Sequence, residues 1–68
     1  MPDNVYKTVE ITGTSSSGMD DAIRNAVSTA ARTLRNLDWY EVVEVRGHIE
    51  DQEVIHTQVT LKIGFRLE

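Results

Sequence analysis

The 68-residue sequence contains no cysteine. Without cysteine the chain forms no disulfide, and it has no Cys/His cluster to hold a structural zinc ion. The single core of a chain shorter than about 70–80 residues rarely supplies more than roughly 3–5 kcal/mol of folding free energy. A chain of this length therefore needs a further source of stability. The composition leaves self-association as that source. The lack of cysteine also suits a reducing compartment.

The chain also lacks an excess of positive charge and any long apolar run. Its formal net charge is −4, which argues against a surface that neutralises nucleic-acid phosphates. No apolar stretch approaches the length of a membrane span, and Met1 to Asn4 show no secretory signal. With no repeat or linker, residues 1–68 are expected to form one domain of a soluble cytoplasmic protein that binds neither nucleic acid nor membrane.

The first third of the sequence predicts a strand followed by a helix. Apolar and polar residues alternate over residues 4–12, which is the period of a half-buried strand, and Gly13 is expected to end it. A helix is predicted over residues 18–36, with Ser17 as its N-cap and Asp20 three residues later, as in a capping box. Its last turn would contain Arg32 and Arg35. One stripe of the helix is apolar and should be buried: Met19, Ile23, Ala26, Val27, Ala30, Leu34 and Leu37.

Two long strands are predicted in the rest of the chain, over residues 39–49 and 55–67, each with its odd-numbered positions on the core face. A three-residue loop around Asp51-Gln52-Glu53 keeps the two apolar faces together, whereas a two-residue loop would mix them. The core pairs would be Ile49 with Ile55, Val45 with Val59, Val43 with Leu61 and Trp39 with Phe65. The opposite face would pair Arg46 with Gln58, His48 with His56 and Glu44 with Thr60.

The order strand, helix, strand, strand predicts an α+β fold. A right-handed crossover leaves the first two strands parallel, with the third antiparallel between them. The result is a three-stranded antiparallel sheet wrapped around one helix. Such a unit leaves a sheet face uncovered and two edges open, which is a further reason to expect a homo-oligomer.

The sequence gives little support for catalysis. Ser15, Ser16 and Ser17 have no histidine in a recognisable arrangement with them. The segment from Gly13 to Gly18 could cradle a phosphate at a helix N-terminus, but it lacks the lysine and spacing of a P-loop, and a capped turn is favoured. His48 and His56 could form a cross-strand metal pair, but a catalytic zinc needs three protein ligands. We therefore expect no catalytic residue, no metal site and no enzyme activity.

Three other side chains could serve a ligand. The only tryptophan, Trp39, stands where the helical pattern changes to a strand pattern, so it could line a cleft or anchor an interface. Arg46 and Gln58 offer directional hydrogen bonds side by side, and the Gln58 amide suits the donor and acceptor edge of a heterocycle. The alternative is a solvent-facing cross-strand pair. The residue pattern leaves these alternatives open.

The sequence closely resembles the dodecin family of small flavin-binding proteins, almost from end to end. The segments that carry the resemblance keep the family's order and spacing. They are Val5-Tyr6-Lys7, Glu10-Ile11-Thr12-Gly13-Thr14-Ser15, Leu37-Asp38-Trp39-Tyr40-Glu41-Val42, Arg46-Gly47-His48 and Gln58-Val59-Thr60-Leu61-Lys62-Ile63-Gly64-Phe65-Arg66-Leu67.

The resemblance implies a hollow assembly of twelve subunits with flavin sites between them. In that family the tryptophan matching Trp39 stacks on the isoalloxazine ring, and the glutamine matching Gln58 binds the polar edge of the ring. Arg46 matches a position near the flavin and could contact its ribityl phosphate, which makes FMN the expected form over riboflavin or FAD. Tyr6 and Arg66 match positions near coenzyme A in some bacterial members, so coenzyme A is a further expected ligand.

By the same resemblance the function is flavin binding, storage and sequestration without turnover. A tryptophan stacked on an excited flavin can donate an electron to it and quench it, which would limit light-driven side reactions. The alternative is a flavin-dependent oxidoreductase that uses the same interface pocket, which would need room for a substrate beside the ring.

Overall fold

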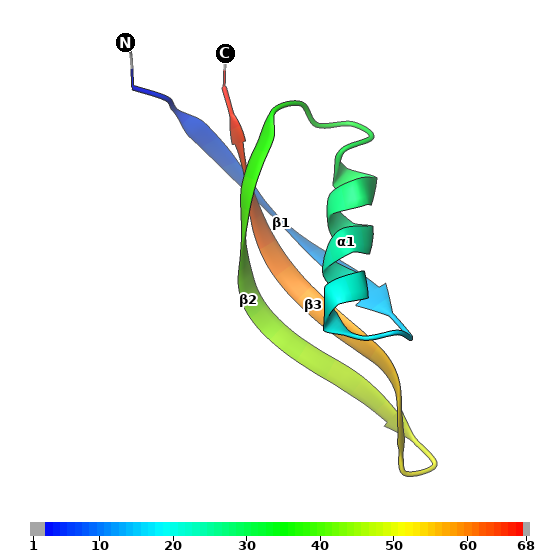
Figure 1. Cartoon of the computed structure of the whole chain (residues 1–68). Coiled ribbons are helices and arrows are strands. Elements are labelled where there is room, and N and C mark those ends of the chain that lie inside the picture. The colour runs from blue at the N-terminus through cyan, green and yellow to red at the C-terminus, as the bar shows by residue number, and fades with distance from the viewer. Residues whose placement is uncertain (1–2, 68) are drawn as a thin grey trace.

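Residues 3–67 form one helix and three strands, in the order strand, helix, strand, strand. The computed structural model describes residues 3–67. Met1 and Pro2, which belong to the segment expected to carry no secretory signal, lie outside the described residues. The elements are β1 (Tyr6–Ser15), α1 (Met19–Ala30), β2 (Leu37–Glu50) and β3 (Glu53–Arg66), as Figure 1 shows. The sheet order is β1-β3-β2, and β3 is antiparallel to both neighbours. This confirms the predicted fold.

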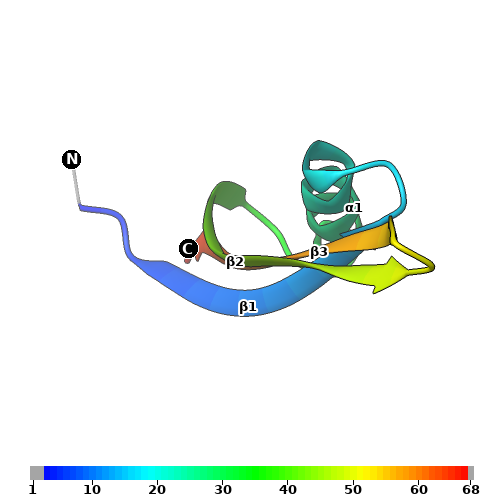
Figure 2. The same ribbon diagram turned by 90° about the horizontal axis from the view of Figure 1, so that it is seen from below.

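The subunit has two layers, with α1 on one face of a long, twisted sheet (Figures 1 and 2). The helix packs on β1 and β3, and the molecule measures 55 × 20 × 14 Å. The small core lies between these elements because odd-numbered positions of β3 face α1. It contains Ala22, Ile23, Ala26, Val59, Leu61 and Ile63.

Strand β1 is longer than predicted at its C-terminal end. Gly13 does not end the strand, which continues to Ser15 through pairs with Val59, Gln58 and Thr57. A Cβ atom at Gly13 would collide with the carbonyl oxygen of Ala22 and approach the Cβ of Ala26 to 2.8 Å. Glycine therefore serves here to let α1 approach β1 closely, and not to turn the chain.

Helix α1 is shorter than predicted, and its N-terminus differs. Its N-cap is Gly18, with φ of 125° and no side-chain cap hydrogen bond, so the expected Ser17–Asp20 capping box is wrong. Instead the Ser15 hydroxyl donates to Asp21 Oδ2 at 2.6 Å and accepts the Ser17 backbone N–H at 2.8 Å. This network ties the end of β1 to the first turn of α1.

The C-terminal end of α1 lies at Ala30, so Arg32 and Arg35 follow the helix and are not in its last turn. The Leu34 N–H still bonds to the Ala30 carbonyl at 3.0 Å, and Asn36 then takes a positive φ of 61°. Leu34 is half-buried, but Met19, which was predicted to lie on the buried stripe, is 45% exposed.

The β2–β3 hairpin turns through two residues, and not through the predicted three. Asp51 and Gln52 both have positive φ, as in type I′ turns, and Glu50 pairs with Glu53. The expected pairing of Ile49 with Ile55 is therefore wrong, because Ile49 pairs with Val54. An irregularity before Ile49 absorbs the shift. It restores the predicted pairs His48–His56, Arg46–Gln58, Val45–Val59 and Glu44–Thr60.

Two more irregularities move the N-terminal half of β2 relative to the prediction. One lies between Val42 and Glu44, so Leu61 pairs with Val42 and not with Val43. The other lies between Leu37 and Trp39. A bulge adds one residue to one strand and so exchanges the faces of the residues beyond it. Trp39 consequently lies opposite Gly64 and not opposite Phe65.

Strand β2 does not contribute the expected odd-numbered core face. All of its residues after Leu37 are exposed in the single chain, including Val43 and Val45. The cause is that α1 lies over β1 and β3, which leaves the α1-side surface of β2 without a covering layer. Within residues 3–67, the only helix is too short and too polar to cross a bilayer.

Candidate functional site

The indole of Trp39 lies against the backbone of β3 on the sheet face away from α1. A Cβ atom at Gly64 would overlap the ring atoms Cε2 and Cζ2 of Trp39, so only glycine lets the ring sit so close to the strand. Trp39 is nevertheless 41% exposed. The ring is thus supported by the sheet and still accessible to a flat partner.

Tyr6 lies beside this ring, and Arg66 is its partner in the sheet register. The centroids of Tyr6 and Trp39 are 6.2 Å apart with an interplanar angle of 58°, which is a tilted aromatic pair. Arg66 lies opposite Tyr6 in the β1–β3 register. The structure therefore gathers three of the five predicted site residues at one end of the sheet, which we call the aromatic end: Tyr6, Trp39 and Arg66.

The other two predicted site residues form a bonded pair farther along the same face. Arg46 Nε donates to Gln58 Oε1 at 3.2 Å. This bond uses the acceptor of the Gln58 amide and leaves its N–H groups to donate to another partner. A hollow of about 340 Å³ surrounds the pair, and we call this region the polar end. Its lining residues are Thr14, Arg46, Gly47, His48, His56 and Gln58.

The two ends share a face but are well separated. Gln58 and Gly64, the partners of Arg46 and Trp39, are both on β3, and six residues of extended strand span about 20 Å. A flat ring stacked on the Trp39 indole therefore lies far from the strand position of Gln58 in the same chain.

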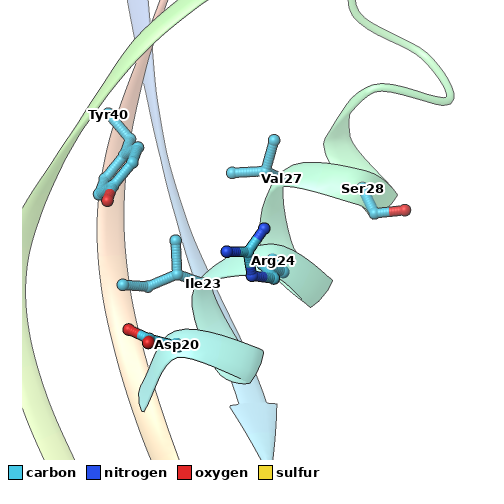
Figure 3. A pocket seen from close by; sticks show the side chains of 6 residues that line it. All are labelled: Asp20, Ile23, Arg24, Val27, Ser28 and Tyr40. Carbon is cyan, nitrogen blue, oxygen red and sulfur yellow. The ribbon is translucent and has the colours of Figure 1, made fainter.

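A second hollow lies on the opposite face, between α1 and β2, and was not predicted from the sequence. It measures about 490 Å³ and is lined by Asp20, Ile23, Arg24, Val27, Ser28 and Tyr40. Figure 3 shows Ile23 and Val27 pointing from α1 toward the Tyr40 side of the gap. The register shift at Val43 turns Tyr40 to this face, and no residue pattern signalled that shift.

Among the residues that the structure describes, no hydrogen bond joins Ser15, Ser16 or Ser17 to a histidine. Ser15 is buried, and its hydroxyl donates to Asp21. Among residues 3–67, no three histidine, aspartate or glutamate side chains gather closely enough to hold a metal ion. The predicted site residues present an exposed indole, a phenol ring, an amide and two guanidinium groups on the outer face.

Comparison with known proteins gives a consistent result over almost the whole chain. The family model described as Dodecin matches residues 5–68. The dodecin of Thermus thermophilus is 53% identical over 64 residues, which are 94% of this chain and 93% of that protein. A solved dodecin from Streptomyces coelicolor is 57% identical, with a TM-score of 0.94 and coverage of 100% of this chain and 97% of that chain. The dodecin from Streptomyces davaonensis is 52% identical, with a TM-score of 0.93 and 98% of each chain covered.

Proposed function

Because the chain belongs to the dodecin family, whose members bind flavins, we propose that it stores FMN between the subunits of a homododecamer. The observation that carries the proposal is the open indole of Trp39, which rests on Gly64 and is exposed on its other side. A rigid aromatic surface of this kind suits stacking with a large flat ring.

The separation of the two ends supports a site built by more than one subunit. Trp39 of one chain would stack on the isoalloxazine ring, and Gln58 of another would donate its amide N–H to a ring carbonyl. Arg46 fixes that amide through the 3.2 Å hydrogen bond and carries the positive charge for the ribityl phosphate. These roles give affinity through stacking and orientation through one amide.

The same arrangement favours storage over turnover. A ring covered by tryptophan leaves little room for a second substrate, and a nearby indole can return an excited flavin to its ground state by electron donation. We propose that the protein sequesters FMN in the cytoplasm and has no enzymatic activity. Steady oxidation of a reductant by the loaded protein would instead favour a flavin-dependent oxidoreductase.

Coenzyme A is a further ligand that we propose for the aromatic end. Tyr6 and Arg66 are opposite one another, and an aromatic ring beside a guanidinium suits an adenine ring with phosphates. Arg66→Ala should lower the affinity for coenzyme A, as measured by titration. The affinity for FMN should change by less than about threefold if the two sites are separate.

Titration of FMN into the purified oligomer tests the proposed function. Flavin fluorescence should be quenched on binding, and Trp39→Ala should weaken binding about 30- to 150-fold, the equivalent of roughly 2–3 kcal/mol for one stacked ring. Trp39→Phe should lie in between. The matched control is Tyr40→Phe, because Tyr40 is the adjacent aromatic on the opposite face, and it should bind as the parent does. Unchanged FMN fluorescence at micromolar protein would overturn the proposal.

A further inference from the structure

The only two histidines of the chain face each other across the hairpin. His48 of β2 lies directly opposite His56 of β3, just before the irregularity at Ile49. Both side chains line the hollow of the polar end. Neither imidazole has a hydrogen bond or an ion pair among the described residues. Two unengaged imidazoles are thus held next to one cavity.

Directly opposed residues on one sheet face have Cβ atoms about 4.5–5.5 Å apart. Two imidazoles at that spacing can turn toward a common point and place one nitrogen each at about 2.0–2.1 Å from a bound ion. The hollow of about 340 Å³ leaves room for water on the remaining coordination positions. The register therefore places the two imidazoles where they can act together as a bidentate ligand.

We propose that His48 and His56 together bind a divalent transition-metal ion of the class of Zn²⁺, Ni²⁺ and Cu²⁺. Imidazole nitrogen is a preferred ligand for these ions, whereas Ca²⁺ and Mg²⁺ prefer oxygen. Cu²⁺ should bind most tightly, in accord with the general order of affinities for nitrogen sites. This proposal does not depend on flavin binding.

The ion would link the two strands reversibly, and the site would not be a catalytic centre. Among residues 3–67 no third histidine or carboxylate joins the pair, so within one chain water completes the coordination shell. An ion held by both residues links β2 to β3 close to the Asp51–Gln52 turn. Because the folded hairpin presents both ligands and the unfolded chain does not, bound metal should raise the unfolding temperature.

Substitution of Arg46 tests the proposal through the direction of the change in metal affinity. It lies two residues before His48 on the same face, about 7 Å along the strand, and its guanidinium is bonded to Gln58. A positive charge at that distance disfavours a second cation. Arg46→Gln should therefore tighten metal binding by about threefold.

The experiment uses the intact oligomer without added histidines, stripped with a chelator and kept near pH 8, because protons compete with metal ions for nitrogen ligands at lower pH. Calorimetric titration with Ni²⁺ or Zn²⁺ should give one ion per chain. Electron paramagnetic resonance of the Cu²⁺ form should show coupling to two imidazole nitrogens. His48→Gln and His56→Gln should each weaken binding at least tenfold, and the control Glu41→Gln, on the same face but far along β2, should change it by less than twofold.

Several outcomes would overturn the proposal. Single-histidine variants that bind as tightly as the parent would assign the ion to carboxylates. Copper coupling to one nitrogen would exclude chelation, and an Arg46→Gln chain that binds more weakly would place the ion elsewhere. The copper spectrum of the unmodified chain keeps the test valid even if a histidine variant fails to fold.

Discussion

Strands β2 and β3 are neighbours of equal length, 14 residues each, yet their burial is opposite. Leu61 and Val59 of β3 have no exposed surface, while their direct partners Val42 and Val45 of β2 are 39% and 47% exposed. All four are aliphatic and all face the α1 side. The difference comes from α1, which packs on β1 and β3.

This contrast divides the molecule into two parts. We call the covered part, made of β1, β3 and α1, the finished half, and we call β2, which no layer covers, the unfinished half. The half formed by β1, β3 and α1 contains the core. The unfinished half exposes large apolar side chains on both faces of β2, namely Trp39, Tyr40, Val42, Val43, Val45 and Ile49. Tyr40, Val42 and Val45 pair with core positions of β3 and so share the α1 side, where they form an apolar surface of the kind that marks an interaction site, whereas Trp39 lies on the outer face. The proposed partners are other copies of the chain, so changes in the two halves should have different consequences.

The largest effect should come from Val42→Asp, which places a carboxylate in the unfinished half. If this surface is buried between subunits, each copy must desolvate an unpaired charge at a cost of several kcal/mol. We expect sedimentation velocity to show loss of the large assembly. Val42→Thr, which keeps the shape without the charge, should retain it. An aspartate variant that sediments as the parent does would remove β2 from the subunit contacts.

Gly13→Ala tests the finished half, and its effect should be on stability. The added Cβ would collide with the backbone of α1 at Ala22, which overpacks the β1–α1 contact at a cost of about 1–3 kcal/mol. Thermal unfolding followed by circular dichroism should show a lower midpoint. Thr12→Ala, on the outer face of the same strand, loses only an exposed hydroxyl pair and should change the midpoint much less. Equal midpoints for the two variants would contradict the close packing.

Gly64→Ala tests where the two halves meet on the outer face. Gly64 belongs to β3, but an added Cβ would displace the indole of Trp39 on β2. We expect FMN affinity to fall about tenfold, which is about 1.4 kcal/mol, because the stacking surface moves. Fluorescence quenching measures the affinity, and sedimentation checks the assembly. Unchanged affinity with an intact assembly would mean that the position of the indole does not set flavin binding.

The fold was largely predictable, because strong periodicity marked every element. Alternation identified all three strands, and the odd-numbered face of β3 is indeed the core. The misplaced details lie where local conformation overrides the pattern. Asp51-Gln52 has none of the glycine typical of a type I′ turn, so the two-residue turn was not recognisable. The irregularity near Val43 leaves no compositional trace either.

The candidate site was predictable in part, and for a definite reason. The pairing of Arg46 with Gln58 depends only on a register that the alternation sets, and it is confirmed. The face of Trp39 depends on the unrecognised irregularities, so the expected core pair with Phe65 is wrong. The correction places Trp39 on the same face as Arg46 and Gln58. The ligand roles of these residues stay predictions.

The smallest effect should come from Gln58→Ala, and two flavins make it informative. The amide is proposed to contact the isoalloxazine ring, which FMN and riboflavin share, and a lost hydrogen bond is typically worth about 1 kcal/mol. Both flavins should therefore bind about fivefold more weakly, as measured by fluorescence titration. Arg46→Ala removes the charge proposed for the phosphate, so it should weaken FMN by a similar factor and riboflavin by less than about twofold. A Gln58→Ala effect confined to FMN would instead place Gln58 at the phosphate, and its amide would then make no hydrogen bond to the ring.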